Sequence, residues 1–509
     1  MTDLSPVTRR TLLLGTGTVA ALTLAACGGG SGSGASDAGG GGGDEEIIIG
    51  STNEPTGLQR NVGGSSGISE TMSRNVYEGL TAIDDSGEVI DLLAESVEVS
   101  EDGLTHTFTL REGVTFHDGS PLTAQDAAWS IAETISEESL SARASDLRVI
   151  NDIEAADDRT LVLTLDHRSA SLRFFLASVT IVRDGDTENT SENGTGPYRM
   201  QEWVQGDHLT LVRNDDYWGE PALNTGVTFR FFADETAMNN ALRAGELDLV
   251  IQQESPDQLG QFEDDPTYTI TEGNSIRKWV WTFNNQMEPF TDVRVRQGLY
   301  KAISRDAILT AVWGDRGEVI GSMPPVPEPW YDDSFAQIHA YDPDAATALL
   351  EEAGATDLSF ALTYVAGSTE ELIVQQIASD LSAVGVTVEL DAIDDSTWYE
   401  RVYSEKNYET TLMNHNNPRD VLWYANPDFY WQYDSPEVQE LAVAAEEAEN
   451  EDAQTDLIHE LAEILAEEAP SAWLFMSPQI RIAREGVTGF SPDKNAEPFY
   501  VASIVRESA

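Results

Sequence analysis

The pattern of apolar and polar positions after residue 45 predicts a chain that alternates strands and helices. Residues 47–52 begin with three isoleucines and predict a buried strand, while residues 104–110 alternate apolar and polar and predict a half-buried strand. Residues 68–80 carry apolar side chains four positions apart, which predicts a helix with one apolar face. Both kinds of element therefore occur in the first part of the chain.

The same patterns continue to the end of the chain. Further strands are predicted at 111–119, 159–165, 200–204, 209–213, 227–232, 248–251, 280–283, 358–364, 386–390, 410–413, 472–476 and 479–483. Further helices are predicted at 124–135, 236–244, 293–303, 345–353, 372–384, 438–449 and 453–468. In the helix 293–303, we expect Arg294, Arg296 and Lys301 to point outward. Four prolines between 324 and 329 favour an ordered loop there. Strand–helix–strand order is what a parallel α/β sheet requires.

Length and charge narrow the classes of protein. A chain of 509 residues is too long for one hydrophobic core, so we expect two or three domains. The net charge of −60 argues against nucleic-acid binding, which needs clustered Lys and Arg. The charge fits either a surface adapted to salt or an ordinary acidic surface from a GC-rich genome. It gives no direct information about a ligand.

The N-terminus has the pattern of an export signal. Arg9 and Arg10 precede an apolar stretch at 12–24, which is shorter than the roughly 20 residues that span a bilayer. The run Leu24-Ala25-Ala26-Cys27 resembles the bacterial lipobox, in which the cysteine is lipidated and becomes the first residue of the mature protein. An ordinary secretory signal with a chance cysteine is the alternative. The arginine pair leaves both the general secretory route and the twin-arginine route open.

Cys27 is the single cysteine of the chain. After processing, neither a disulfide nor a thiolate metal site can therefore form elsewhere, and no cofactor or metal is predicted. Residues 31–43 are almost wholly Gly, Ser, Ala and Asp, which behave as a flexible coil. The sequence thus predicts a lipid-anchored protein on the outer face of the cytoplasmic membrane, at the cell surface or in the periplasm.

Catalytic motifs give little support for an enzyme. Residues 63–67 match G-x-S-x-G, but that nucleophile motif needs a strand directly before it and a helix directly after it. The sequence has no H-E-x-x-H, no P-loop and no G-x-G-x-x-G between a strand and a helix. Adjacent acidic residues such as Asp84 and Asp85 are expected on solvated faces of so acidic a chain. No catalytic residue is therefore assigned.

Several short segments together indicate a family. They are residues 75–80 (NVYEGL), 100–103 (SEDG), 110–114 (LREGV), 116–119 (FHDG), 123–126 (TAQD), 194–198 (GTGPY), 217–219 (YWG), 292–297 (DVRVRQ) and 341–343 (YDP). In this order and spacing, the chain resembles the family 5 extracellular solute-binding proteins, which include dipeptide, oligopeptide and nickel binders of ABC transporters. Most of these residues are expected to be architectural.

The resemblance implies an α/β fold of the type II periplasmic-binding kind, with two hinged lobes and an extra β-rich insert domain. The implied divisions are a signal peptide at 1–26, a tether at 27–45, a first lobe at 46–78, 194–272 and 480–509, an insert at 79–193 and a second lobe at 273–479. Two strand crossovers, near Gly273 and Gln479, would form the hinge. Such lobes close because the ligand contacts both of them only in the closed state.

The implied function is that of a substrate-binding component of an ABC importer. It would capture a peptide or similar small polar solute as a monomer and deliver it, chemically unchanged, to a permease and its ATPase. A ligand-binding sensor of the same fold is an alternative that no feature of the sequence separates from transport. A secreted hydrolase is a further alternative, which turnover of a bound peptide or glycan would reveal.

Candidate ligand-binding residues fall in three places. Asn53 and Glu54 follow the first strand, where relatives place cleft residues. Trp279, Trp281 and Asn284 lie on a strand beside the expected hinge, with both indoles on one side, so they form either a stacking wall for ligand or part of the core.

The third place is the loop 413–428, which mixes amides, an imidazole, a guanidinium, a carboxylate and aromatic rings. Its candidates are His415, Asn416, Arg419, Asp420, Trp423 and Tyr424; a structural role for the loop is the alternative. In dipeptide-binding relatives an aspartate of this region pairs with the ligand's amino group, and Asp420 is its nearest match. Their carboxylate-binding arginine has no match between Tyr364 and Leu372, which disfavours a dipeptide. A longer peptide, a nickel complex or another polar solute stays open.

Overall fold

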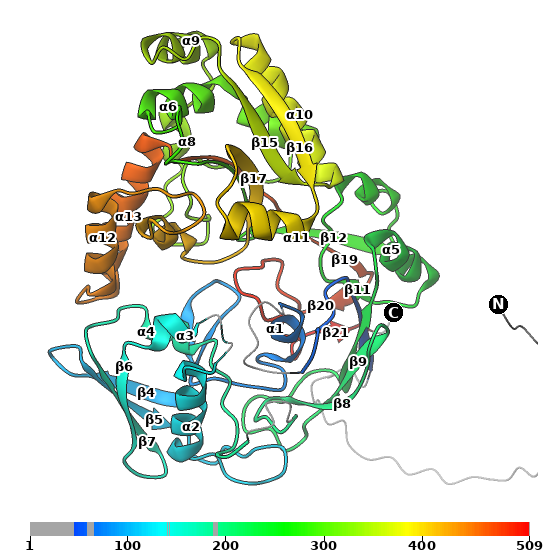
Figure 1. Cartoon of the computed structure of the whole chain (residues 1–509). Coiled ribbons are helices and arrows are strands. Elements are labelled where there is room, and N and C mark those ends of the chain that lie inside the picture. Colours follow the sequence, from blue (N-terminus) through cyan, green and yellow to red (C-terminus); the bar gives the residue numbers. More distant parts are fainter. Residues whose placement is uncertain (1–44, 59–65, 140, 142, 187–191, 508–509) are drawn as a thin grey trace, which may run out of the picture. The chain divides into compact units, whose positions relative to one another are not determined.

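The computed structural model describes residues 45–58, 66–139, 141, 143–186 and 192–507. Residues 42–509 form one compact unit, and all the described residues lie in it. The expected signal peptide, the lipidation site Cys27 and nearly all of the tether lie outside the described residues, as does most of the Gly63–Gly67 motif. Figure 1 shows the elements and their labels.

The first sheet contains seven strands within the described residues. Its order is β12 (Tyr268–Gly273), β19 (Gln479–Arg484), β11 (Leu249–Val250), β1 (Glu46–Ser51), β10 (Gly226–Phe231), β9 (His208–Arg213) and β8 (Tyr198–Val204). The central strand β1 is parallel to both of its neighbours, β10 and β11. Helices α1 (Ser66–Met72) and α5 (Glu235–Ala244) and the 3-10 helix η1 (Pro256–Gln261) belong to this part of the chain. Strands far apart in sequence therefore meet in one sheet.

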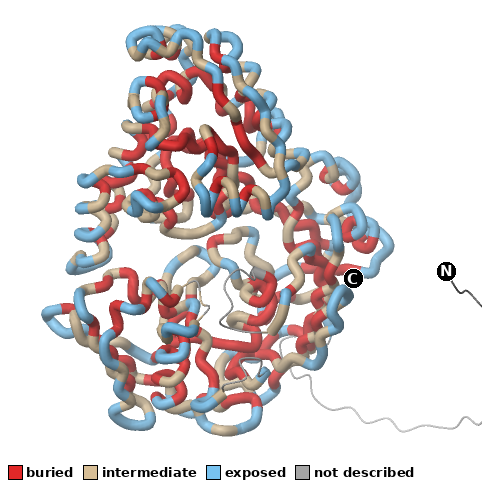
Figure 2. The backbone as a smooth tube through the Cα atoms, in the orientation of Figure 1, coloured by how far each residue is buried: buried red, intermediate tan, exposed pale blue. Residues whose placement is uncertain are grey.

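The second sheet has six strands in the described part of the chain. Its order is β14 (Glu318–Val319), β18 (Ser471–Met476), β13 (Lys278–Phe283), β17 (Thr410–His415), β15 (Ser359–Val365) and β16 (Thr387–Ile393). Its helices are α6 (Val293–Ala302), α7 (Arg305–Trp313), α8 (Phe335–Ile338), α9 (Pro343–Glu352), α10 (Ser368–Ala383), α11 (Asp395–Trp398), the π-helix η2 (Tyr399–Ser404), the 3-10 helix η3 (Asp420–Ala425), α12 (Pro436–Glu446) and α13 (Glu451–Glu468). β13 and β18 are buried along their whole length, and Figure 2 shows buried chain in the interior of this part of the molecule, with exposed chain on the helices around it.

The third sheet is antiparallel and is built from residues 94–165. Its order is β4 (Ala94–Val99), β5 (Thr105–Leu110), β7 (Thr160–Leu165) and β6 (Ile150–Ala155). Helices α2 (Ala124–Ile135), α3 (Ala144–Leu147) and α4 (Leu172–Leu176) accompany it, and two small ladders pair β2 (Thr81–Ile83) with β3 (Val89–Asp91) and β20 (Val487–Thr488) with β21 (Val505–Arg506). Helix α2 has the predicted bounds, because Thr123 and Asp126 form a capping box at its start.

The chain passes twice between the first and second sheets. It leaves β12 at Gly273 and enters β13 at Lys278, and it leaves β18 at Met476 and enters β19 at Gln479. The two crossovers lie side by side, since the Ser275 hydroxyl donates to the Ser477 carbonyl at 2.5 Å. The Ser477 N–H in turn donates to the Arg277 carbonyl at 3.0 Å. These bonds tie the crossovers into a pair.

The helix predicted at 68–80 is wrong in its extent, because α1 ends at Met72. Arg74 has a φ of 63°, and its N–H donates to the Tyr77 carbonyl in a tight turn. A residue in the left-handed region ends a helix. Val76 and Leu80 continue the apolar four-residue spacing past the end of the helix because both belong to the buried core. They lie in a turn and a loop, not in the helix.

Two other predictions are also wrong. The strand expected at 111–119 is replaced by turns at Gly113 and Gly119, both with φ above 80°, and the described residues there contribute one isolated bridge. Arg296 points inward, not outward: it is buried and its guanidinium donates to the carbonyls of Phe290, Glu468 and Ala469. A fixed set of buried carbonyl acceptors stabilises a buried guanidinium. The pattern of polar and apolar positions along the chain does not show which carbonyl groups will surround Arg296.

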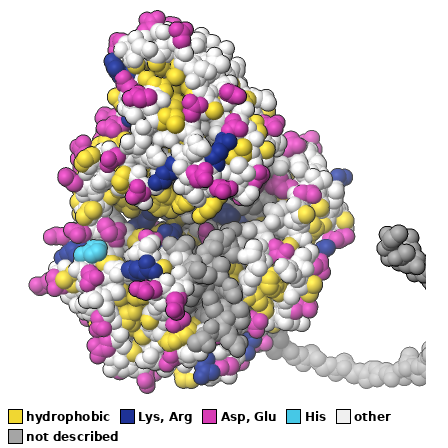
Figure 3. Space-filling model, viewed as in Figure 1, with side chains coloured by type: hydrophobic (Ala, Val, Ile, Leu, Met, Phe, Trp, Pro, Cys, Tyr) yellow, Lys and Arg dark blue, Asp and Glu magenta, His cyan; other side chains and the backbone are white. Residues whose placement is uncertain are grey.

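The surface visible in Figure 3 carries many acidic side chains and few basic ones, as the net charge of −60 requires. Among the described residues, the helices are all too short or too polar to cross a membrane.

Candidate functional site

A cavity of about 320 Å³ opens where the two crossovers meet the first sheet. This volume lies at the lower end of the range for small-molecule sites, about 300–1,000 Å³. Its lining comes from the end of β1 (51–53), the segment after β11 (251–254), both crossovers (275–277 and 477–479), and Glu70, Trp313, Asn416, Lys494, Ala496 and Glu497. Residues of the first sheet and residues from the part of the chain that builds the second sheet, Trp313 of α7 and Asn416 after β17, therefore face one space.

The sheet topology explains why polar groups gather here. β1 and β11 run parallel, with Gly50 opposite Val250, so the segments that follow them leave the same edge of the sheet. Ligands bind at the carboxyl edge of parallel strands in many open α/β sheets. The side chains of Asn53, Gln252 and Glu254 project from these two segments into the lining of the cavity.

A buried carboxylate and a lysine form one side of the cavity. Glu70 is buried and accepts a hydrogen bond of 2.8 Å from the Ser51 hydroxyl. The Lys494 ammonium lies 3.7 Å from the Glu70 carboxylate and donates to the Gln252 side-chain oxygen at 2.7 Å. Burial lowers the pKa of Lys494, although the Glu70 charge acts in the opposite direction.

An ion pair joins the first sheet to the first crossover. The Arg277 guanidinium pairs with the Glu254 carboxylate, and its Nε donates to the Asn416 side-chain oxygen at 3.3 Å. Burial by itself would raise the pKa of Glu254, but the charge and hydrogen bond of Arg277 outweigh it and hold that pKa below its usual range. Arg277 thus contacts a residue from each sheet region inside the cavity.

The family can be assigned once this geometry is known. The model for the middle region of the bacterial extracellular solute-binding proteins, family 5, matches residues 88–440, more than half of the chain. The chain belongs to this family. The di/tripeptide-binding protein 2 of Pseudomonas aeruginosa is 30% identical over 379 residues, which cover 66% of this family 5 protein and 69% of the relative. The match to the first curated relatives spans 65% of their own length.

Solved structures show the same fold as this family 5 protein. The oligopeptide-binding protein AppA from Bacillus subtilis, solved with a nonapeptide, has a TM-score of 0.74 at 21% identity, covering 92% of this chain and 99% of that one. The substrate-binding protein CtaP from Listeria monocytogenes has a TM-score of 0.81 at 22% identity, covering 91% and 99%. The expected fold is confirmed: a type II α/β architecture with two lobes, built on the first and second sheets, and a β-rich insert.

Two of the predicted site residues line the cavity of this family 5 protein. They are Asn53, after β1, and Asn416, after β17. Glu54, next to Asn53, lies elsewhere: its carboxylate accepts hydrogen bonds from the Trp203 indole at 3.1 Å and the Gly206 N–H at 2.7 Å. The first lobe thus uses Glu54 for a contact within itself.

The strand residues beside the hinge are packed in the second lobe. Trp281 is fully buried, with its ring 4.9 Å from that of Phe283. Trp279 is also buried, and its indole N–H donates to the Ser477 hydroxyl at 3.1 Å, so it abuts a crossover residue of the cavity. The Asn284 amide donates to the carbonyls of Lys406 and Tyr408. The strand β13 and the residue that follows it place these three side chains in the lobe interior.

Asp420 and His415 lie in a buried polar cluster. The Asp420 carboxylate receives the Lys278 ammonium at 2.8 Å, and both side chains are fully buried. Burial raises the pKa of Asp420 to about 7, although Lys278 opposes the shift. His415 is the last residue of β17 rather than a loop residue, and its Nε2 lies 2.8 Å from the Tyr430 hydroxyl. In this structure Asp420 therefore pairs with an ammonium of the protein itself.

The other three loop candidates also contact protein. Arg419 reaches toward the insert, with its guanidinium 4.4 Å from the Phe174 ring centre. Tyr424 is buried and stacks on Trp431 at 4.0 Å. Trp423 is partly buried and lies 5.2 Å from the Phe429 ring. The loop's aromatic residues thus pack against one another rather than around the cavity.

Sequence reasoning missed Glu70, Glu254, Arg277 and Lys494. Arg277 could have been found, since it lies four residues past the expected hinge crossover at Gly273. Lys494 could not, because the loop 491–500 has no strand or helix that would place it against β11. Among the described residues, no group of three or more His, Cys, Asp or Glu is placed to hold a metal ion.

Proposed function

We propose that this family 5 protein is the solute-binding component of an ABC importer and that it binds peptides or similar polar solutes. The observation that carries the proposal is the polar cavity where both crossovers meet the first sheet, lined by residues of both lobes. Relatives that carry peptide-binding names support a peptide as the ligand class. A solute held there contacts both lobes, so its binding energy favours the closed arrangement.

The proposal also states where the solute binds, which segments form the hinge and where the lobes and the insert begin and end. The cavity, with Asn53 and Asn416 in its lining, is the proposed site, and the paired crossovers 274–277 and 477–478 are the proposed hinge. We also propose the lobe and insert boundaries given above, 46–78, 194–272 and 480–509 against 79–193 and 273–479. Backbone N–H and C=O groups of a peptide would supply hydrogen bonds that do not depend on its sequence.

The direct test is to identify the bound solute. Protein purified without denaturation is extracted and analysed by mass spectrometry, and the compound found is then titrated by calorimetry. Recovery of a peptide that binds with a Kd in the micromolar range or tighter supports the proposal. Conversion of that compound into products by the purified protein would instead favour the hydrolase.

Anchoring and delivery are further parts of the proposal. Cys27 would carry the lipid, and the Gly/Ser-rich residues 31–43 would let the lobes reach a permease and its ATPase. Metabolic labelling with a radioactive fatty acid should label the wild type and leave Cys27→Ser unlabelled. Uptake of the identified solute should be lost when the permease genes are deleted, and this would distinguish transport from sensing.

A further inference from the structure

The insert is held to the first lobe at several points. The carboxylate of Glu78, where the chain enters the insert, accepts hydrogen bonds from Thr195, Tyr217 and Trp218 of the first lobe. Trp218 also packs against the apolar core of the insert, and Trp129 of the insert packs against the apolar core of the first lobe. Because each part places a side chain against the core of the other, the insert moves with the first lobe when the lobes open.

The insert also contacts the second lobe, on the side of the molecule away from the crossovers. Figure 1 shows α4 of the insert beside the ends of α12 and α13, while β12 and β19, which lead to the crossovers, lie on the other side of the view. Here the Arg419 guanidinium donates to the Ser171 hydroxyl at 2.7 Å, and the Gln454 amide donates to the same hydroxyl at 3.1 Å. One buried hydroxyl of the insert thus accepts two hydrogen bonds from the second lobe.

The end of α12 adds further bonds to this contact. The Glu446 carboxylate accepts hydrogen bonds from the Ser169 hydroxyl and the Ser171 N–H, and the Glu446 carbonyl accepts one of 2.7 Å from the Ala170 N–H. The Arg419 guanidinium also stacks on the Phe174 ring. We call this set of residues the insert contact: Ser169, Ala170, Ser171 and Phe174 of the insert, and Arg419, Glu446 and Gln454 of the second lobe.

The insert contact is polar, whereas the crossovers are surrounded by apolar packing. The apolar core of the second lobe extends past the crossovers to Ile480 and Ile482 of β19, but among the described residues it includes none of the insert. A polar contact separates at little cost in free energy, because water replaces its hydrogen bonds and little apolar surface becomes exposed. The insert contact can therefore break while the cores of both parts stay intact.

Each half of the insert contact is prepared within its own part. On the second lobe, the Arg419 N–H donates to the Glu328 carboxylate at 2.6 Å. This bond helps to hold Arg419 at a φ of 58°, in the left-handed region that disfavours residues other than glycine. Such backbone strain is often found in segments with a part in conformational change. On the insert, the Ser171 hydroxyl makes no capping bond to α4, although Ser171 stands at its N-terminus. That hydroxyl serves the contact with the second lobe instead.

We propose that the insert contact is a latch, which forms when the lobes close, breaks when they open, and holds part of the solute-free protein closed. Rotation of the second lobe about the crossovers carries its half of the contact away from α4, because the insert stays with the first lobe. All the residues of the contact lie outside the cavity lining. The latch therefore raises the affinity for every solute by one factor and leaves the preference among solutes unchanged. The inference rests on the proposed function, since it needs two lobes that close around a solute.

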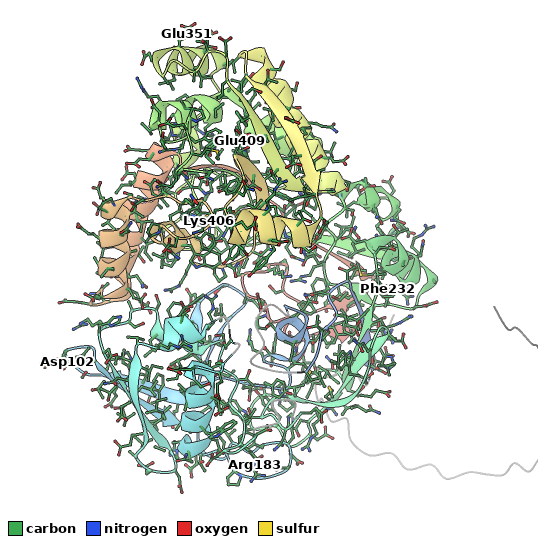
Figure 4. The ribbon with its side chains drawn as sticks, viewed as in Figure 1. Asp102, Arg183, Phe232, Glu351, Lys406 and Glu409 are labelled. Atoms are coloured by element: carbon green, nitrogen blue, oxygen red, sulfur yellow. The ribbon has the colours of Figure 1, made fainter. Side chains whose placement is uncertain are left out.

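A distance measurement tests the latch without any solute. Spin labels are attached to Asp102→Cys in the insert and Glu351→Cys in α9 of the second lobe, both of which are exposed and labelled in Figure 4. Cys27→Ser removes the one cysteine of the chain, so that the labels react only at these two positions. Pulsed electron resonance then gives the distribution of distances between the labels. For the solute-free protein with an intact latch, we expect a closed and an open population.

The latch is weakened by Ser169→Ala combined with Ser171→Ala, which removes two hydroxyls and no charge. We expect the closed population of this solute-free variant to fall at least fivefold. Arg419→Met, which breaks the same contact from the second lobe, should have the same effect. The control is Ser178→Ala at the other end of α4, because the exposed Ser178 hydroxyl donates to the Phe175 carbonyl within the insert. Its distances should match those of the protein with an intact latch.

Calorimetry with peptides gives a second measurement. Two defined pools of tripeptides are titrated, one with apolar and one with charged side chains. We expect the combined Ser169→Ala and Ser171→Ala variant to bind both pools about 10-fold more weakly than the wild type, with faster dissociation in stopped-flow experiments. The ratio between the two affinities should stay within twofold of its wild-type value. Saturating peptide should restore the closed distance in every variant.

The outcomes separate the latch from the proposed function. A smaller closed population in the latch variants, without binding of either pool, supports the latch and overturns a peptide as the solute. Peptide binding with distances and affinities equal in wild type, latch variants and control overturns the latch and leaves the proposed function intact. A change in affinity for one pool alone also overturns the latch, since the contact would then act on the solute itself. One fixed distance in every protein, with and without peptide, overturns both the latch and the hinged lobes.

Discussion

Arg419 donates a hydrogen bond of 2.7 Å from its guanidinium to the hydroxyl of Ser171, which lies 248 residues earlier in the chain. Ser171 precedes α4 of the insert, whereas Arg419 precedes η3 of the second lobe. Glu446 adds to this contact, because it accepts bonds from the Ser169 hydroxyl and the Ser171 N–H. The insert and the second lobe are therefore fastened to each other at a place distinct from the crossovers.

Loss of the Arg419 contact should lower the free energy of unfolding and weaken the contact between the insert and the second lobe. We expect Arg419→Met to lower the free energy of unfolding by about 2 kcal/mol, because it removes a charge-assisted hydrogen bond and the stacking on Phe174. Denaturant unfolding of the variant and the wild type would measure this difference in free energy. Lys406→Met is a matched control: Lys406, labelled in Figure 4, is also a cation with positive φ, but it does not join the insert to the second lobe. Equal losses in both variants would contradict the assignment.

The resemblance motifs turn out to share a structural role that their spacing alone could not reveal. Glu78, from NVYEGL, is buried and accepts hydrogen bonds from Thr195 of GTGPY and from Tyr217 and Trp218 of YWG. Three segments that are far apart in sequence thus meet at one carboxylate. Their role at Glu78 is architectural, as the sequence predicts for most of the resemblance motifs.

The elements themselves were largely predictable, because local periodicity determines them. Helix α2 and strands β5, β7 and β19 lie within one residue of the predicted bounds. The site was less predictable, because its charges come from four distant segments. The mixture of polar and aromatic residues in the loop 413–428 is typical of a ligand site. In the structure, however, Asp420 pairs with Lys278 and His415 contacts Tyr430. Which polar groups pair with each other depends on tertiary packing, and no local pattern records it.

The buried pair of Lys278 and Asp420 should be sensitive to loss of one partner. Lys278→Met removes the cation that opposes the raised pKa of Asp420, so the buried carboxyl either takes up a proton or stays charged without a partner. Above the pKa of Asp420, where the carboxyl is charged, we expect a loss of about 3–5 kcal/mol in the free energy of unfolding. The double variant Lys278→Met with Asp420→Leu should recover part of that loss, because no charge then stays buried. A double variant as unstable as the sum of the two single variants would show that the pair is not coupled.

His415 should make the protein less stable in mild acid. Burial, aided by the charge of Lys278, lowers the pKa of His415 to about 3 from its ordinary value of 6.5. The unfolded chain takes up a proton at this side chain below pH 6.5 while the folded protein does not until about pH 3. The contribution of neutral His415 to the free energy of unfolding is therefore lost as the pH falls from 6.5 toward 3, by about 1.4 kcal/mol per pH unit. Between pH 6.5 and 4, His415→Gln should lose less stability than the wild type, which pH-dependent denaturant unfolding would show. An imidazole NMR signal of His415 that titrates above pH 5 would contradict this.

The titration of Glu78 should change the free energy of unfolding with pH in the direction opposite to that of His415. Burial raises the pKa of Glu78 from 4.5 to about 7, despite the three hydrogen bonds from Trp218, Tyr217 and Thr195 that stabilise its charged form. The folded protein holds a proton that the unfolded chain has released, so this contribution is complete below pH 4.5 and is lost as the pH rises to 7. The linkage amounts to about 3 kcal/mol across that window.

Glu78→Gln provides the measurement, because glutamine imitates the protonated carboxyl and can donate to the Tyr217 hydroxyl. We expect the variant to match the wild type near pH 4.5 and to exceed it in free energy of unfolding by pH 7.5. Trp218→Phe is a useful companion, since removing the indole donor takes away one bond to the charged form and should raise the pKa of Glu78 further. A Glu78→Gln profile parallel to that of the wild type between pH 4.5 and 7.5 would mean that Glu78 is charged throughout this range and that its three donors outweigh its burial.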